Sequence, residues 1–139
     1  QVIHICGKGH LDPSINEKGS IQFEYVNESL KDLFAITDYV LSRAGSNAIF
    51  EFLALKIPML LIPLPLSASR GDQILNAQSF VKSGYAYSVD EETLTNDQLL
   101  QELKRLKAYG ASLQDNMKNF NSEDARNQVI DMIKRTAKP

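Results

Sequence analysis

Two polar side chains, Asn47 and Glu51, interrupt a stretch of sequence that is otherwise almost wholly apolar, SRAGSNAIFEFLALKIPMLLIPLPL. They are four residues apart, so on a helix they share one narrow face. Ser46 and Asn47 follow a turn of small residues, where free backbone N–H groups and the helix dipole suit a phosphate. Glu51 lies one turn deeper and could accept hydrogen bonds from a ribose diol, as acidic residues do in dinucleotide-binding folds. The plainer interpretation is that Glu51 points to water and that Asn47 only begins the helix.

A second polar pair, Asp72 and Gln73, follows the next apolar run and a glycine, Gly71. An acid beside an amide can accept and donate hydrogen bonds to adjacent hydroxyls of a sugar. The alternative is that Asp72 merely caps its helix. Two polar groups at successive strand ends, in otherwise apolar sequence, favour a crevice for a nucleotide sugar.

The elements that must position these residues alternate between strand and helix. We predict strands over 1–6, 20–26, 38–43, 58–64 and 85–89, and helices over 27–37, 47–55, 72–84, 95–109, 111–120 and 122–135. Expected helix caps are Asn27, Ser46, Thr95 and Ser122, with Gln98 completing a capping box and Gly84 closing the third helix. The run PMLLIPL is apolar on both faces, which is typical of a parallel sheet covered on both sides. The pattern predicts an α/β fold with a Rossmann-like, doubly wound parallel sheet and C-terminal helices.

Size and charge narrow the functional classes. The chain has 139 residues, enough for one domain, and its net charge of −2 offers no basic surface for nucleic acid. No apolar run approaches the length of a membrane-spanning helix. The single cysteine, Cys6, cannot form an internal disulfide, which fits a reducing compartment.

Other residues that could do chemistry carry weaker signals. His4, Cys6 and His10 lie close in sequence, but a metal site would need further ligands in closed geometry, so positions in the core or at its rim are favoured. Lys8 lies in GKG, which lacks the spacing of a phosphate-binding P-loop, and a solvated lysine is favoured. Arg43 follows a strand and could pair with a carboxylate or face the crevice. Arg70 could reach a ligand or another domain.

SRAGSNAIFEFLALKIPMLLIPLP, RGDQILNA and HICGKG together resemble the C-terminal half of the MurG family of N-acetylglucosaminyltransferases, in its Gram-positive form. The similarity covers nearly the whole chain and is strongest over 25–77. It implies that the chain, 1–139, is one nucleotide-sugar-binding domain, the donor half of a two-domain GT-B glycosyltransferase. Because the sequence opens directly on a strand, we expect a fragment whose first strand–helix unit is missing.

The resemblance also implies roles for individual residues. Tyr25 and Val26 fall where the family packs uracil, Ser46 and Asn47 at the diphosphate, Glu51 at the ribose, and Asp72 and Gln73 at the sugar hydroxyls. The family often has an amide at Asp72 and a threonine at Ala48, so those two contacts are expected to differ. The implied donor is UDP-N-acetylglucosamine, the reaction inverts the anomeric centre, and neither a metal nor another cofactor is expected.

The expected function is therefore the donor-binding half of an enzyme that transfers N-acetylglucosamine to undecaprenyl-diphospho-muramoylpentapeptide in peptidoglycan synthesis. The acceptor and the general base would belong to the missing half, so no catalytic residue is assigned and the chain alone is expected to be inactive. The implied location is the cytoplasmic face of a bacterial membrane, through peripheral contact. Two alternatives stay open: a stand-alone donor-binding subunit of a two-chain enzyme, and a non-catalytic nucleotide-binding module of flavodoxin-like type.

Overall fold

The computed structural model describes residues 1–120 of the 139-residue chain. The chain separates into two compact units, Gln1–Thr37 and Asp38–Pro139. Each unit has its own parallel sheet. The strands therefore form two sheets, where the sequence predicts one continuous doubly wound sheet.

The first unit consists of two parallel strands joined by a long loop and followed by a short helix. β1 (Val2–Ile5) and β2 (Ser20–Phe23) pair in parallel, and α1 covers Leu30–Ala35. The long loop between the strands is tied to β2 by side chains. The Gln22 amide bonds both backbone groups of Asp12, and Glu24 accepts from Gly9 N at 2.7 Å. None of the residues 1–37 is buried.

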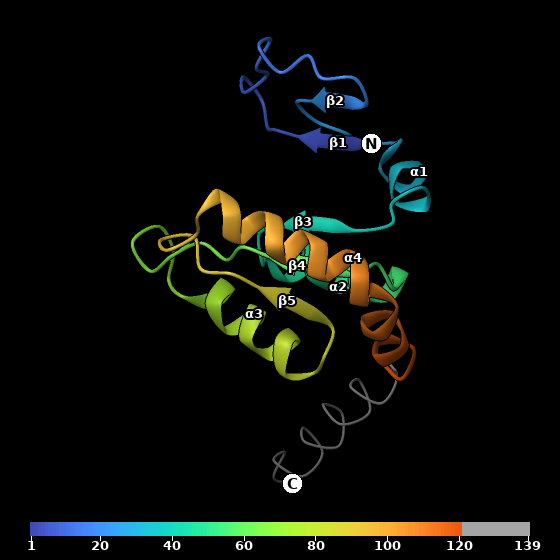
Figure 1. The fold of residues 1–139 in the computed structure, drawn as a ribbon, viewed down its shortest axis with the longest axis vertical. Coiled ribbons are helices and arrows are strands. Elements are labelled where there is room, and N and C mark those ends of the chain that lie inside the picture. Colours follow the sequence, from blue (N-terminus) through green and yellow to red (C-terminus); the bar gives the residue numbers. More distant parts are fainter. Residues whose placement is uncertain (121–139) are drawn as a thin grey trace, which may run out of the picture. The chain divides into compact units, whose positions relative to one another are not determined.

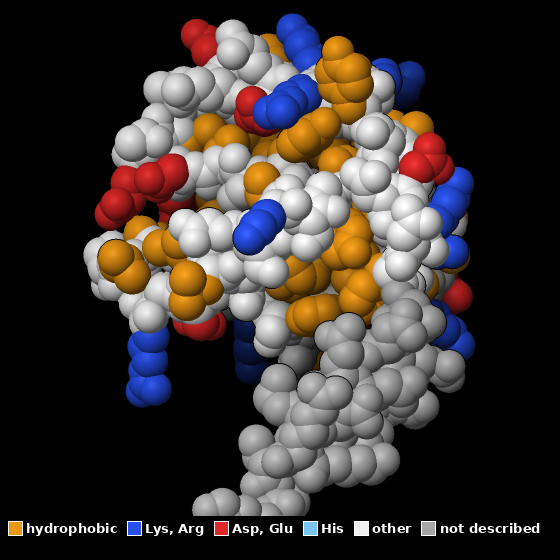
Figure 2. Space-filling view, turned by 90° about the horizontal axis from the view of Figure 1, so that it is seen from below, with side chains coloured by type: hydrophobic (Ala, Val, Ile, Leu, Met, Phe, Trp, Pro, Cys, Tyr) orange, Lys and Arg blue, Asp and Glu red, His pale blue; other side chains and the backbone are white. Residues whose placement is uncertain are grey.

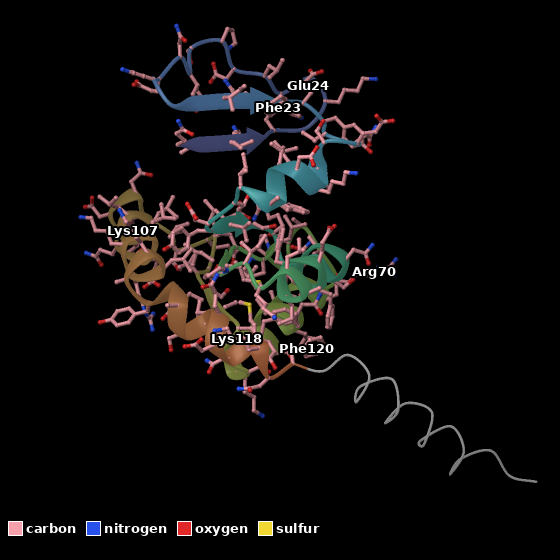
Figure 3. The ribbon with its side chains drawn as sticks, turned by 90° about the vertical axis from the view of Figure 1, so that its right-hand side faces the viewer. Phe23, Glu24, Arg70, Lys107, Lys118 and Phe120 are labelled. Atoms are coloured by element: carbon pink, nitrogen blue, oxygen red, sulfur yellow. The ribbon has the colours of Figure 1, made fainter. Side chains whose placement is uncertain are left out.

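The second unit is a three-stranded parallel sheet in the order β3-β4-β5, formed by Val40–Ser42, Met59–Leu61 and Ala86–Ser88. The helices in the described part of this unit are α2 (Ser46–Leu55), α3 (Asp72–Lys82) and α4 (Asn96–Lys118). α2 and α4 lie on opposite faces of this sheet (Figures 1 and 3). The alternation of parallel strands and helices confirms the predicted α/β class.

The core of the second unit is built around its central strand. All three residues of β4 are fully buried, as the apolar run on both faces predicts. Helix residues close the core from both sides; they are Ile49, Phe52 and Leu53 of α2, Ala77 and Phe80 of α3, and Leu106, Leu113 and Met117 of α4. No polar or charged side chain is buried in the described part of the chain.

Several predicted boundaries need correction. Every strand is shorter than expected, and Tyr25 and Val26 follow β2 instead of ending it. β4 stops at Leu61 because Pro63 has no N–H to extend the ladder. α1 begins after Ser29 and not after Asn27. The predicted helix 122–135 and its cap Ser122 lie outside the described residues.

The predicted pair of helices, 95–109 and 111–120, is one continuous helix, α4. Gly110, which suggests a break, is buried inside it, and a Cβ there would lie 2.7 Å from Tyr39 Cε1. Glycine is therefore present because the helix backbone approaches Tyr39 closely, and the helix does not end there. The capping box at its start is confirmed, with Gln98 N donating to Thr95 Oγ1 at 3.2 Å and Thr95 N to Gln98 Oε1 at 2.9 Å.

Candidate functional site

The carboxyl end of β3 leads through a short turn into α2. Gly45 is the residue before the helix, with extended φ and ψ of −66° and 134°, and Gly45 O accepts from Ile49 N at 3.1 Å. The amides of Ser46, Asn47 and Ala48 precede the first intrahelical hydrogen bond, so they are free to bind an anion. Ser46 is the first helical residue and makes no side-chain cap, so its predicted capping role is wrong.

The outer face of α2 carries the predicted polar stripe. Ser46, Asn47 and Glu51 are all exposed, and the side chains of Asn47 and Glu51 have no hydrogen bond or ion pair with the described residues. The exposed face is wider than the sequence predicts, because Phe50 and Leu55 are also about half-exposed. Both polar groups are thus available to a ligand along one helix face.

The start of α3 rules out the simpler role for Asp72. Gly71 precedes the helix with a φ of +86°, and Asp72 is the first helical residue. The Asp72 carboxylate makes no capping hydrogen bond and is exposed. The interpretation of Asp72 as a helix cap is therefore wrong, and its carboxylate is unpaired within residues 1–120.

One end of the Gln73 side-chain amide, its oxygen, is used by hydrogen bonds within the fold. Its Oε1 accepts from Leu64 N at 3.1 Å and from Ala44 N at 3.3 Å. These two amides lie just beyond the ends of β4 and β3, so one side chain joins both strand ends. Gln73 Oε1 is therefore already paired, and only Nε2 is left to donate to a ligand.

Two further residues at this sheet edge were not assigned by the sequence. Asn76 Nδ2 donates to Ala44 O at 3.0 Å, from a position one turn after Gln73 on α3. The i, i+3 spacing of two amides, Gln73 and Asn76, was the available signal. Glu91, just after β5, accepts two hydrogen bonds from Arg43, at 2.6 and 2.8 Å.

Arg43 therefore pairs with a carboxylate. Its guanidinium also donates to Ile62 O at 3.2 Å, so it connects the chain after β3 to the chain after β4 and β5. The hydrogen bonds from Arg43 lower the pKa of Glu91, and the same bonds raise the pKa of Arg43. Both side chains remain substantially exposed, so the pair contributes modestly to stability.

The two residues predicted to contact the uracil ring lie in the first unit. Tyr25 is 73% exposed and Val26 is partly exposed. Neither side chain makes a hydrogen bond to the described residues. An exposed phenol ring is free to lie against a planar ring, but nothing in the first unit fixes its direction.

The remaining polar candidates do not come together into a site within residues 1–120. In residues 1–120 no group of three or more His, Cys, Asp and Glu side chains could hold a metal ion. Cys6 Sγ contacts Phe23 O at 3.3 Å, and Lys8 is exposed. Arg70, labelled in Figure 3, is exposed in the loop before α3 and makes no hydrogen bond or ion pair with residues 1–120.

The surface carries no concentrated positive charge on the face shown in Figure 2, where Lys and Arg side chains are scattered among apolar and acidic ones. Within residues 1–120, no helix combines the length and the apolar character needed to cross a membrane.

The second unit is a parallel α/β unit. It has free amides and a carboxylate along α2 and an acid–amide pair at the start of α3. These features define a Rossmann-like domain of the type that binds ligands at its strand ends. Comparison with known sequences identifies the family of this domain. The model of the glycosyltransferase family 28 C-terminal domain matches residues 1–135, and the chain belongs to this family.

Similar curated proteins come from several bacteria. The chain is 54% identical to a protein of Oceanobacillus iheyensis over 99% of its own length, and 53% identical to one of Staphylococcus aureus over 96%. Both are named UDP-N-acetylglucosamine--N-acetylmuramyl-(pentapeptide) pyrophosphoryl-undecaprenol N-acetylglucosamine transferase. The chain spans 39% and 38% of the lengths of these two relatives. The predicted resemblance to the MurG family is confirmed.

A solved structure supports the fold. The crystal structure of Acinetobacter baumannii MurG matches 96% of this chain with a TM-score of 0.74 at 19% identity, and the match covers 40% of that protein. The predicted fold, the C-terminal half of a GT-B enzyme, is thereby confirmed. The predicted site residues are not tested by this likeness, so they stay predictions.

Proposed function

We propose that this chain is the donor-binding part of an inverting glycosyltransferase that moves N-acetylglucosamine from UDP to undecaprenyl-diphospho-muramoylpentapeptide. The observation that carries the proposal is the 54% identity, across 99% of the chain, to a protein named for this transfer. The free amides at the start of α2 fit a diphosphate, and the unpaired Glu51 fits a ribose diol.

The proposed assignments follow the donor from its base to its sugar. Tyr25 packs against uracil and the Val26 backbone bonds its edge. Ser46 and Asn47 bind the diphosphate and Glu51 the ribose hydroxyls. Asp72 accepts from sugar hydroxyls, while Gln73 donates to one through Nε2, because its oxygen is held by Ala44 and Leu64.

The chain's contribution to the reaction is to bind and orient the donor. Amides at a helix start stabilise the negative charge that grows on the diphosphate as it leaves the sugar. The group that removes a proton from the acceptor belongs to another part of the full-length enzyme, and the chain alone transfers no sugar. The acceptor is lipid-linked, so the enzyme works at the cytoplasmic face of the membrane by peripheral contact.

The test is a titration of the protein that carries this chain, at its full length, with UDP-N-acetylglucosamine, UDP and GDP. Calorimetry should show binding of both uridine nucleotides and much weaker binding of GDP. A matched assay with lipid-linked muramoylpentapeptide should show transfer by the full-length protein and none by residues 1–139. Equal affinity for UDP and GDP, or transfer by the 139-residue chain, would contradict the proposal.

A further inference from the structure

Ala44 is held by hydrogen bonds on both sides. Its N–H donates to Gln73 Oε1 at 3.3 Å, and its C=O accepts from Asn76 Nδ2 at 3.0 Å. Ala44 itself is fully buried, so water cannot replace either bond. One helix, α3, therefore fixes the backbone at the end of β3 through two side chains on its own face.

The held residue sits directly before the start of α2. Ala44 precedes Gly45, whose carbonyl accepts the first hydrogen bond of that helix from Ile49 N at 3.1 Å. A rotation about the Ala44–Gly45 linkage would re-aim the free amides of Ser46 and Asn47. The direction of these amides thus depends on α3, which belongs to the next strand–helix unit.

We infer that Asn76 is a positioning residue that orients the phosphate-binding amides at the start of α2 by holding Ala44. This inference rests on the proposed function, since it takes those amides as the diphosphate site. The positioning role needs no contact between Asn76 and the donor, because Asn76 Nδ2 acts through its hydrogen bond to Ala44 O. Gln73 shares the positioning role through its oxygen and keeps Nε2 for the sugar.

The position predicts a selective defect. Loss of the Asn76 amide should weaken every ligand that carries the diphosphate and spare a ligand without it. One neutral hydrogen bond corresponds to about a five- to tenfold change in affinity. A purely structural role would lower stability and would weaken all ligands by the same factor.

The chain offers a matched control on α4. Asn116 Nδ2 donates to Gly84 O at 3.0 Å, which is also a bond from a helix asparagine to a loop carbonyl. Gly84 lies before β5, at the amino end of a strand, whereas Ala44 lies after β3, at the carboxyl end. Asn116→Leu should therefore leave ligand affinity unchanged, and because its bond is exposed it should cost less stability than Asn76→Leu.

The experiment measures uridine, UDP and UDP-N-acetylglucosamine affinity for the wild-type protein at full length and for three variants. Asn76→Leu keeps the branched shape of the side chain and removes the donor, Asn76→Gln keeps an amide, and Asn116→Leu is the control. We expect Asn76→Leu to weaken UDP and UDP-N-acetylglucosamine about five- to tenfold with uridine unchanged. Asn76→Gln should recover part of the loss. If Asn76→Leu does not fold, Asn76→Ser is measured in its place, with the same expectation.

The outcomes separate the two proposals. Wild-type UDP affinity in Asn76→Leu would overturn the positioning role and leave the proposed function standing. Equal losses for uridine and UDP, or an equal loss in Asn116→Leu, would assign Asn76 a merely structural role and overturn the inference. No UDP binding by the wild-type protein would overturn the proposed function and the inference with it.

Discussion

The two units of this chain differ in how the residues proposed to bind the donor are held. In the second unit, β4 is fully buried and side chains of α3 and Arg43 join the ends of all three strands. In the first unit no residue is buried, and the loop between β1 and β2 is held by exposed side-chain bonds. Val2 is 60% exposed and Tyr25 is 73% exposed.

The difference teaches which part of a ligand each unit can orient. None of the side chains of residues 1–37 is buried, so packing does not fix their directions. The second unit has a core that holds its strand ends in place, so groups at those ends are pre-positioned. We therefore expect the phosphate, ribose and sugar contacts of the second unit to be specific, and the base contact of the first unit to be adaptable.

The largest expected effect tests the comparison through stability. Leu60→Ala empties a fully buried position in the centre of β4 and should lower the free energy of unfolding by about 2–5 kcal/mol. Ile21→Ala on β2, where the side chain is 51% exposed, should cost no more than about 1 kcal/mol. Urea unfolding of the 139-residue chain measures both. Similar costs would show that the first unit is better packed than its exposure indicates.

The next largest effect concerns Glu51 in the second unit. A hydrogen bond to a carboxylate contributes about 1.5–3 kcal/mol. Glu51→Ala in the full-length enzyme should therefore lower kcat/KM for the donor by roughly ten- to a hundredfold with the fold intact. Glu51→Gln should lose less, because an amide still offers one acceptor. Wild-type donor kinetics in both variants would make Glu51 a helix-surface residue only.

The sequence predicted the second unit better than the first because burial leaves a stronger pattern. The apolar run of β4 and the alternating elements around it indicated a covered parallel strand, and that is observed. Gly110 misled the prediction of helix ends, since its close approach to Tyr39 is a tertiary contact that local sequence does not encode. The alternation of polar and apolar residues in SIQFEYV predicts Tyr25 inside a strand, although the pairing stops at Phe23.

The site was predictable only in its outline. The polar residues at two successive strand ends were visible as breaks in apolar sequence. The bonds among them were not, because Gln73 and Asn76 reach backbone groups 29 and 32 residues away. The partner of Arg43, which is 48 residues distant, was equally hidden. Sequence spacing thus identified candidates but not which of their atoms the fold already uses.

A smaller effect compares base and sugar contacts directly. Tyr25→Ala should weaken UDP and intact donor together, by about tenfold, because stacking on the base is common to both. Asp72→Ala should lower donor turnover with UDP inhibition nearly unchanged, since it removes only a sugar contact. The structure alters the expectation for Gln73. Gln73→Ala also removes the acceptor for Ala44 N and should therefore weaken UDP binding. Gln73→Glu keeps an acceptor for both amides and should lose only the sugar contact.

The measurements for this comparison are the UDP inhibition constant and the donor kcat/KM of all four variants. Equal losses of UDP affinity in Tyr25→Ala and Asp72→Ala would contradict the division between base and sugar. An unchanged UDP constant in Gln73→Ala would show that Ala44 keeps its position without that bond.

The smallest effect is the pH dependence of the Arg43–Glu91 pair that joins strand ends in the second unit. The hydrogen bonds from Arg43 lower the pKa of Glu91 below its ordinary value of 4.5, so the folded state favours the carboxylate. The stabilisation is therefore complete above about pH 4.5, the value expected for the unfolded chain, and is lost as pH falls through the lowered pKa of the folded state. Glu91→Gln should melt at a slightly lower temperature than wild type at pH 7, and this difference in melting temperature, the gap, should close toward pH 3.

Arg43→Gln removes the same pair, so its gap should narrow over the same range but stay open, because Arg43 also donates to Ile62 O. Thermal unfolding midpoints at intervals from pH 7 to pH 3 measure both gaps. A gap for Glu91→Gln that stays constant over this range would mean that the pair does not couple the strand ends in solution, and the stronger positioning of the second unit would then rest on Gln73 and Asn76 alone.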